Sequence, residues 1–219
     1  MNVSVILSGG VGVRFGNELP KQYQMLRGKE VIAYVVEAMK RSGLTDKIVI
    51  VAGRDDIPRL QKTYGVDCAE AGNTHNASVK SGLDFIKKHY PECRKVLFAD
   101  AARPFLTGAI VDRYFEFLDE YDGVITAQHI TDSLGREGEA FVDRTPYYLI
   151  QKPEAFIFEQ AYAHFSAESA TTAIVQQLPE GTNIKKNFDI RQNLKITYPE
   201  DLPLAEYLME LRLKEEEKK

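Results

Sequence analysis

The sequence predicts a doubly wound, mostly parallel α/β sheet with a projecting β-hairpin arm. Short runs of β-branched residues alternate with segments of helical periodicity, and a glycine-rich loop follows the first run. A later stretch of scattered β-formers surrounds a charged turn. This β-α-β-α order favours parallel strands joined by right-handed crossovers. All 219 residues are expected to form one domain, 1–219, with the arm at about 128–150.

The first 127 residues carry the regular alternation. We expect strands at Val3–Leu7, Lys47–Val51, Val66–Glu70, Lys95–Ala99 and Gly123–Ala127. Helices are expected at Val31–Arg41, Asp55–Tyr64, Asn76–His89 and Ala109–Tyr121. Gly43 and Pro91 are typical residues just beyond a helix end. Pro58 falls in a first turn, where proline is tolerated.

The alternation breaks after residue 127. Gln128–Leu149 has β-formers around the charged sequence GREGE, which indicates a two-stranded excursion. A helix is expected over Glu154–His164. The segment beginning NLKIT predicts a short strand, a proline-marked turn and a C-terminal helix. The tail KEEEKK is typical of a frayed, solvated helix end.

Composition and charge exclude several classes of function. The chain has 44% hydrophobic and 27% charged residues, ordinary values for a globular protein. A net charge of -4 gives no overall attraction to nucleic acid, and no apolar run is long enough to span a membrane. Nothing resembles a signal peptide, so a cytoplasmic location is expected. Cys68 and Cys93 are too few for a disulfide framework or metal cluster, and the four histidines lack metal-ligand spacing.

The stretch SGGVGVRFGNELPKQY after the first strand indicates a phosphate-binding loop. Glycines let the backbone approach an anion and direct several N–H groups toward it. The sequence has no Gly-Lys-Ser/Thr for a P-loop, and the third glycine of a dinucleotide fingerprint comes one residue late, at Gly16. Arg14 and Lys21 add positive charge around the bend at Pro20. The structural alternative is a flexible turn with two surface cations.

A longer set of motifs is more specific than the loop alone. It comprises LSGGVGVRFGNELPKQYQMLRGKEVI, AGNTHNASVKSGL, LFADAARPFL, VDRTPYYLIQKPEAF and QNLKITYPEDLPLAEYLM. Together these stretches resemble the 2-C-methyl-D-erythritol 4-phosphate cytidylyltransferases and their ribitol-5-phosphate cytidylyltransferase relatives. The resemblance is weakest between Ser166 and Gln192. It implies a Rossmann-like nucleotidyltransferase sheet that joins CTP to a polyol phosphate, giving a CDP-polyol and pyrophosphate.

The implied reaction brings two anions together. An oxygen of the acceptor phosphate attacks the α-phosphorus of CTP and needs no side-chain base, because a phosphate monoester with a second pKa of about 6 is mostly a dianion at neutral pH. Positioning and fixed cations should therefore carry catalysis. The resemblance implies that Arg14, Lys21 and Lys195 are the catalytic residues. Asp100 is the implied ligand of Mg²⁺, which prefers a carboxylate with phosphate oxygens, and Arg103 is expected to pair with it or fix its loop.

The resemblance also implies two substrate sites. The nucleotide-binding residues are small or carry short polar groups: Ser8, Gly9, Gly10, Gly12, Gly72, Asn73 and Ser78. The implied acceptor-binding residues are Arg144, Lys152 and Thr171, and Lys195 is a further candidate for the acceptor phosphate. Arg144 lies in the arm, which in the family crosses to a second subunit. A homodimer through the arm is therefore implied.

The acceptor-side motifs depart from the family pattern. Lys152 stands where the pattern has threonine, His75 where it has arginine, and Ala99 where it has histidine. An acceptor resembling ribitol 5-phosphate, or another alditol phosphate, is therefore an alternative to methylerythritol phosphate. Two further alternatives are a sugar-1-phosphate nucleotidyltransferase that uses another nucleoside triphosphate, and a non-catalytic nucleotide-binding relative.

Overall fold

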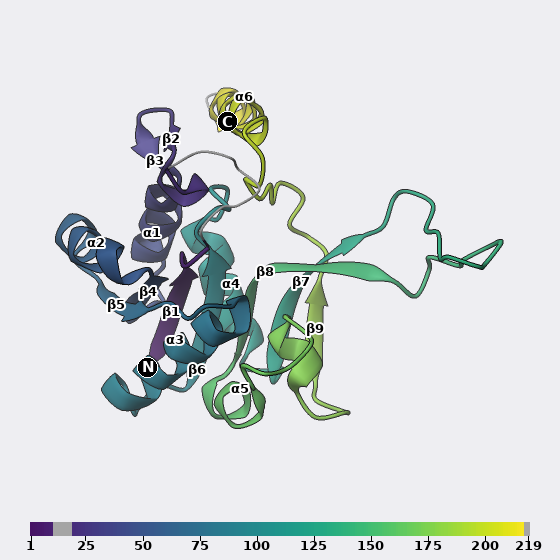
Figure 1. Cartoon of the computed structure of the whole chain (residues 1–219), viewed down its shortest axis with the longest axis horizontal. Helices are drawn as coiled ribbons and strands as arrows, with labels where there is room; N and C mark the ends of the chain where they lie inside the picture. Colours follow the sequence, from purple (N-terminus) through teal and green to yellow (C-terminus); the bar gives the residue numbers. More distant parts are fainter. Residues whose placement is uncertain (11–18, 217–219) are drawn as a thin grey trace.

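A single twisted sheet forms the centre of the computed structural model, which describes residues 1–10 and 19–216. Its strands are β1 (Asn2–Leu7), β4 (Lys47–Ala52), β5 (Asp67–Glu70), β6 (Lys95–Asp100), β7 (Gly123–His129), β8 (Tyr148–Ile157) and β9 (Ile184–Asn187). These seven strands lie in the order β5-β4-β1-β6-β8-β7-β9 (Figure 1). Only β8 within this sheet runs antiparallel to its neighbours. The predicted mostly parallel sheet is confirmed.

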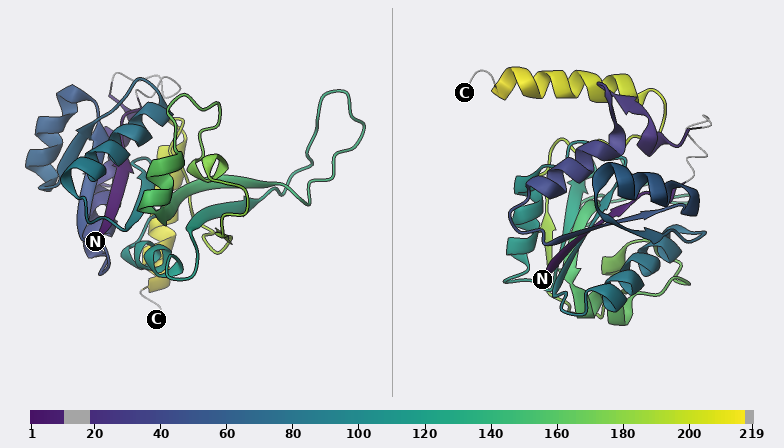
Figure 2. Two further views of the ribbon diagram at one scale, coloured as in Figure 1. Left: turned by 90° about the horizontal axis from the view of Figure 1, so that it is seen from below. Right: turned by 90° about the vertical axis from the view of Figure 1, so that its left-hand side faces the viewer.

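Helices cover both faces of the sheet, as a doubly wound fold requires (Figure 2). They are α1 (Val31–Arg41), α2 (Ile57–Tyr64), α3 (His75–His89), α4 (Gly108–Phe117), α5 (Phe158–His164) and α6 (Asp201–Glu216). Short 3-10 turns occur at Lys21–Tyr23, Arg54–Asp56 and Ile174–Gln177. A small hairpin of β2 (Met25–Leu26) and β3 (Lys29–Glu30) lies beside α6.

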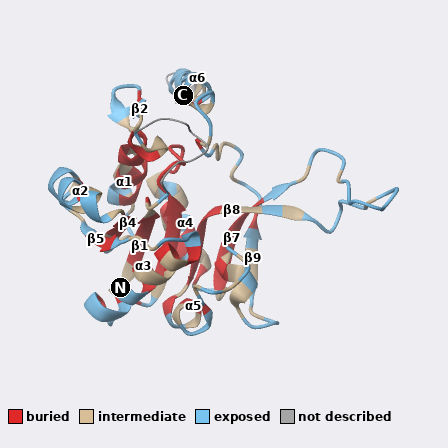
Figure 3. Ribbon diagram, in the orientation of Figure 1, coloured by how far each residue is buried: buried red, intermediate tan, exposed pale blue. Residues whose placement is uncertain are grey.

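Alternation along the central strands divides the core between the two faces. On β4, Ile50 packs in the cluster that includes α1 and α4, whereas Val49 packs in the cluster with α3 and α5. Leu97 and Phe98 of β6 divide in the same way. Successive side chains on a strand point to opposite faces, so both faces can bury apolar area. Figure 3 shows the buried residues concentrated along these strands and the helix faces against them.

The predicted helix over Glu154–His164 is wrong in its first turn. Residues 154–157 continue β8 and pair with β6, with Glu154 opposite Phe98 and Ile157 opposite Lys95. The helix begins at Phe158. Pairing between two strands that flank this segment outweighs its local helical pattern.

Other differences lie in the second half of the chain and in short elements. The predicted strand in NLKIT is absent, and Ile196 instead donates its N–H to the Ala102 carbonyl oxygen at 2.9 Å. Strand β9 was not predicted, and neither was the β2–β3 hairpin. The helix predicted over Ala109–Tyr121 ends earlier, at Phe117.

The predicted arm projects from one side of the sheet (Figure 1). Strands β7 and β8 pair as far as His129 opposite Tyr148. Residues 130–147, all of which the structure describes, form no strand beyond that pair. The strand pairing of the excursion is therefore confined to its base.

Both cysteines are free and buried. Burial raises the pKa of the Cys68 thiol to about 11 and that of the Cys93 thiol to about 12. Within the part of the chain that the structure describes, no helix has the length and apolar character needed to cross a bilayer.

A buried hydrogen-bond chain joins α4 to three strands. Thr126 donates its hydroxyl to the Pro153 carbonyl oxygen at 2.7 Å, so the Tyr114 hydroxyl, 2.6 Å from Thr126 Oγ1, must be the donor of that contact. Asn187 Nδ2 in turn donates to the Tyr114 oxygen at 3.2 Å. Burial raises the pKa of Tyr114 to about 12, so the phenol stays protonated. The chain ties α4, β7, β8 and β9 together.

Tyr114→Phe is expected to lower the free energy of unfolding by about 1–3 kcal/mol, because it leaves buried polar groups of Thr126 and Asn187 without their partner. Urea denaturation measures this loss. Tyr207→Phe is the control, because Tyr207 is 59% exposed and its change should lie within about 0.5 kcal/mol. Equal unfolding free energies for wild type and Tyr114→Phe would contradict the role assigned to this chain.

Candidate active site

The carboxyl ends of β1 and β6 bring the glycine loop and Asp100 to one edge of the sheet. Leu7, the last residue of β1, lies opposite Asp100, the last residue of β6. Open α/β sheets bind ligands at this edge. A cavity of about 230 Å³ opens there. Its lining includes Ser8, Gly9, Gly10, Lys21, Gly72, Asn73, Ser78, Asp100 and Lys195.

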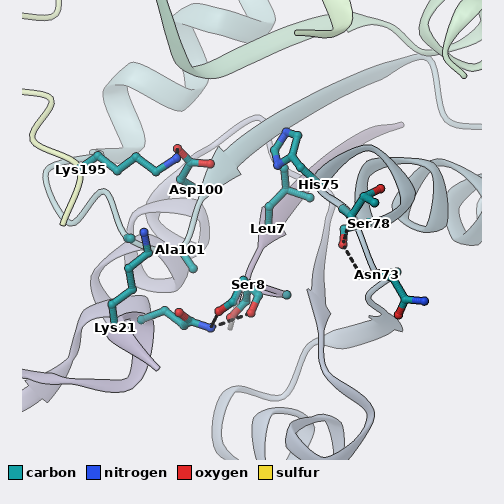
Figure 4. A pocket seen from close by; sticks show the side chains of 15 residues that line it. Leu7, Ser8, Lys21, Asn73, His75, Ser78, Asp100, Ala101 and Lys195 are labelled. Carbon is teal, nitrogen blue, oxygen red and sulfur yellow. Dashed lines mark hydrogen bonds and ion pairs between the residues drawn. The ribbon is translucent and has the colours of Figure 1, made fainter. Parts of the chain in front are cut away.

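This cavity brings together most of the residues predicted for the nucleotide site. All the predicted nucleotide-binding residues that the structure describes line it, and so do Lys21, Asp100 and Lys195. Gly12 and Arg14 lie outside the described residues. Figure 4 shows the Lys21 and Lys195 side chains entering from the side of the cavity opposite Asn73 and Ser78.

Two glycines allow the loops around this cavity to approach closely. A Cβ on Gly9 would lie 2.4 Å from the Ala71 Cβ, and one on Gly72 would lie 2.3 Å from the Ala77 Cβ. Any side chain would force the glycine loop, the segment before α3 and the first turn of α3 apart. Among the described residues, no atom lies within 4 Å of a Cβ built on Gly10.

Side-chain hydrogen bonds fix the backbone of the same loops. Gln22 is 4% exposed and donates from Nε2 to the carbonyl oxygens of Ser8 at 2.8 Å and Gly10 at 3.2 Å. Thr74 caps α3 by accepting from the Ala77 N–H at 3.0 Å, and Ser78 Oγ donates to the Thr74 carbonyl oxygen at 3.0 Å. Gln22 was not predicted as a site residue, although it lies in the PKQ part of the first motif.

A second cavity, of about 550 Å³, adjoins the first. It is lined by β8, by Thr172, Ala173 and Gln176, and by Arg103. Lys152, predicted to bind the acceptor, lines it as well. His75, Asp100 and Lys195 line both cavities. Two ligands bound side by side would therefore meet at these three residues.

Asp100 lies in a cluster of positive charge. Lys195 Nζ and Arg103 Nε each lie 3.0 Å from Asp100 Oδ2. Burial raises the pKa of Asp100, but the charges of Lys195, Arg103 and Lys152 outweigh that effect and hold the pKa well below its usual range. The predicted pairing of Arg103 with Asp100 is confirmed. Asp100 is thus a carboxylate at neutral pH.

Asp100 is also linked to the wall of the second cavity. Arg103 Nη1 donates to the Asn193 carbonyl oxygen at 2.6 Å. Asn193 Nδ2 donates in turn to the Lys152 carbonyl oxygen at 2.8 Å and to Gln151 Oε1 at 2.7 Å. The Lys152 ammonium group pairs with the carboxylate of Glu154, and both side chains are nearly inaccessible to solvent. The ends of β6 and β8 and the segment 193–195 therefore form one connected unit.

His75 was expected only as a departure from the family pattern and was not predicted to be a site residue. It begins α3 and lines both cavities, and Figure 4 shows its side chain at the first of them. Partial removal from water lowers the pKa of His75, and the charge of Lys152 lowers it further. The imidazole is therefore neutral at pH 7. The sequence signal that could have identified His75 is its place in the motif AGNTHNASVKSGL, where the family pattern has arginine.

Two predicted acceptor residues lie away from the cavities of this single chain. Arg144 is on the arm, where its Nη1 donates to the carbonyl oxygens of Thr131 and of Asp132, the latter at 2.9 Å. Thr171 precedes the wall residues Thr172 and Ala173, but its hydroxyl donates to Gln176 Oε1. Neither side chain lines the described second cavity.

The described residues contain no group of three or more His, Cys, Asp or Glu side chains arranged to hold a metal ion. Asp100 is an ionised carboxylate that lines both cavities. A single carboxylate can hold a cation such as Mg²⁺ when phosphates and water supply the remaining ligands.

Comparison with known proteins identifies the family of this chain. The model of the 2-C-methyl-D-erythritol 4-phosphate cytidylyltransferase family matches residues 2–211. A relative of that name from Neorickettsia sennetsu is 33% identical over 223 aligned residues, covering 94% of this chain and 95% of its own. One from Cereibacter sphaeroides (strain KD131) is 30% identical over 219, covering 95% and 96%.

A solved structure supports the fold. The 4-diphosphocytidyl-2C-methyl-D-erythritol synthase from Anaerococcus prevotii has a TM-score of 0.80 and covers 95% of this chain and 96% of its own, at 23% identity. The mostly parallel sheet and its flanking helices are thus shared. On the family match over residues 2–211 and the relatives of nearly equal length, the chain belongs to the 2-C-methyl-D-erythritol 4-phosphate cytidylyltransferase family of nucleotidyltransferase enzymes.

Proposed function

We propose that this enzyme transfers the cytidylyl group of CTP to 2-C-methyl-D-erythritol 4-phosphate and releases pyrophosphate. The observation that carries the proposal is the pair of adjoining cavities with His75, Asp100 and Lys195 common to both. A two-substrate transfer needs such a junction, because the attacking oxygen and the α-phosphorus must be held in contact.

The first cavity is proposed to bind CTP. Ser8 and Gly9 of the glycine loop line it together with Gly72, Asn73 and Ser78. The close packing of these loops favours a pyrimidine over a larger purine. Lys21 lines the end of the cavity toward Asp100, where the triphosphate would lie. Arg14, in the same motif, is proposed as a second triphosphate contact, and Gly12 as part of the loop.

The second cavity is proposed to bind the polyol phosphate. Its ionic lining groups are three cations (Arg103, Lys152 and Lys195) and two carboxylates (Asp100 and Glu154), an excess of one positive charge with His75 neutral. That excess favours an anionic ligand such as a phosphate monoester. Gln151, Thr172 and Gln176 offer polar groups to the hydroxyls. We propose that the chain forms a homodimer in which the arm carries Arg144 to the acceptor bound by the second copy. Thr171 is proposed to bind the acceptor from the segment beside Thr172.

Catalysis at the junction is proposed to rest on fixed charge. The acceptor phosphate is already a nucleophile at neutral pH, so no group on the chain has to remove a proton. Lys21 and Lys195 would stabilise negative charge that develops on the α-phosphoryl oxygens. The ion pair with Asp100 would hold the Lys195 ammonium group in place before substrates bind.

Asp100 is proposed as the protein ligand of a Mg²⁺ ion. The ion would supply charge neutralisation for the triphosphate. Asp100 suits this role because it is ionised and lies where the first cavity meets the second. Its Oδ2 atom already accepts from two cations, which keeps the carboxylate in a fixed orientation.

The deciding experiment measures pyrophosphate release with each of four nucleoside triphosphates and a panel of acceptors: methylerythritol phosphate, ribitol 5-phosphate and a sugar 1-phosphate. Preference for CTP and methylerythritol phosphate supports the proposal. Preference for ribitol 5-phosphate would replace the acceptor, as the Lys152 departure allows. Turnover with a sugar 1-phosphate and another nucleotide would overturn both substrate assignments.

Lys195→Ala is expected to lower kcat by roughly 100- to 1000-fold, because it removes a preorganised cation at the reacting centre. Steady-state kinetics measures the loss. Lys214→Ala is a matched control, since Lys214 also forms an ion pair, with Glu210 at 2.8 Å, but on the exposed helix α6. A Lys195→Ala enzyme with wild-type kcat would remove Lys195 from the mechanism.

Chelation of divalent metal is expected to abolish turnover, and added Mg²⁺ should restore it. In Asp100→Asn, half-maximal activity should need a higher Mg²⁺ concentration, because a neutral amide binds Mg²⁺ more weakly than a carboxylate does. A Mg²⁺ titration of both enzymes measures the shift. Full activity with excess chelator, or an unchanged Mg²⁺ dependence, would contradict the assignment.

A further inference from the structure

Asn76 connects two segments that are distant in the sequence. It lies in the first turn of α3 and is 5% exposed. Its Nδ2 donates to the carbonyl oxygen of Ser169 at 2.9 Å and to that of Thr171 at 3.0 Å. Both partners are carbonyl oxygens, which only accept, so the orientation of the amide follows from them. The side chain thus fastens the segment 169–171 to the start of α3.

This connection leaves one polar atom without a partner. Asn76 Oδ1 is buried and has no hydrogen-bond partner among the described residues. An unpaired buried carbonyl oxygen is unfavourable for folding. Stability alone therefore gives a poor account of asparagine at this position. The two donated bonds are its clear contribution.

Asn76 is in the described lining of neither cavity, but it joins segments that are. His75 directly before it lines both cavities. The residues that follow the Thr171 carbonyl group line the second cavity but not the first; they are Thr172, Ala173 and Gln176. The distance from α3 to this wall therefore depends on the Asn76 amide.

Hydrogen bonds within residues 166–177 also hold the conformation of this segment. Gln177 Nε2 donates to the Thr171 carbonyl oxygen at 3.3 Å, and Gln177 Oε1 accepts from the Ser166 N–H at 2.8 Å. Ile174 anchors the same segment in the core. Loss of the Asn76 bonds should therefore shift the wall near residue 172 while the segment stays folded.

We propose that Asn76 is a positioning residue for the acceptor: it holds the segment 169–176 as a wall of the second cavity and so sets acceptor affinity. The inference rests on the proposed function, because it assigns the acceptor to that cavity. The nucleotide contacts of the first cavity come from other residues. Changing Asn76 should therefore affect the two substrates unequally.

The experiment compares Asn76→Ala and Asn76→Asp with wild type in steady-state kinetics, varying CTP and methylerythritol phosphate in turn. Asn76→Asp keeps the shape but turns a carboxylate toward two carbonyl oxygens. The acceptor KM should rise about tenfold, equivalent to ~1.4 kcal/mol, while the CTP KM stays within about twofold. Gln177→Ala removes hydrogen bonds at the other end of the segment and should raise the acceptor KM while leaving the CTP KM unchanged. This variant replaces the Asn76 variants in the test if they do not fold.

Asn183→Ala is the matched control. Asn183 Nδ2 also donates to a backbone carbonyl oxygen, that of Glu120 at 3.1 Å, but it is exposed and lies at the opposite edge of the sheet. Its replacement should change the melting temperature little and leave both KM values unchanged. An unchanged acceptor KM in folded Asn76 variants, or an equal rise in both KM values, overturns the inference.

Failure of the proposed function would give a different result, since the wild-type chain itself would not turn over CTP with any polyol phosphate.

Hydrogen exchange tests the hydrogen bonds between Asn76 and the segment 169–171 directly, without turnover. Asn76→Ala should increase exchange of the amides at 169–173 and leave that of the α3 amides after Ser78 unchanged. Equal exchange at 169–173 in both proteins would overturn the inference independently of turnover.

Discussion

The carboxylate of Asp100 is the group on which the rest of the candidate site depends. It ends a central strand and holds Lys195 and Arg103 through one oxygen atom. Arg103 in turn holds the Asn193 carbonyl oxygen, and Asn193 holds Lys152 on β8. A buried ion pair is costly to break, because removing one partner leaves an uncompensated charge. Segments about 50 and 95 residues away in sequence are thus fixed to the same point.

The first half of the fold could be predicted from the sequence because its signals are local. Each strand there is a short apolar run, and each helix has an apolar stripe of its own period. α1 was predicted at the residues it occupies, Val31–Arg41. The second half depends on partners distant in sequence. Residues 154–157 form a strand because β6 and β7 flank them. The segment 193–197 is held by Arg103 and by the Ala102 carbonyl oxygen and does not become a strand. No local pattern encodes such neighbours.

The site was predictable to the extent that motifs carry it. Motif residues in four separate stretches, among them Ser8, Gly72, Asp100 and Lys195, line one cavity. The supporting groups were harder to foresee. Gln22 and Asn193 act through backbone carbonyl oxygens of other segments, contacts that depend on backbone positions rather than on residue type. His75 was set aside because an isolated histidine has no spacing to interpret, whereas its position at the junction is a property of the assembled fold.

The two cavities draw on different parts of the chain. Apart from Lys195, the described lining of the first cavity comes from residues 7–102. Most of the residues that line only the second cavity lie within 148–176. Substitutions within 148–176 can reshape one cavity while the loops of the other keep their packing. Under the proposed assignment of the two cavities, the architecture therefore offers a modular route for diversification: a lineage, or a designer, can exchange the acceptor chemistry and inherit the nucleotide chemistry unchanged. The three residues common to both cavities mark the boundary of that freedom.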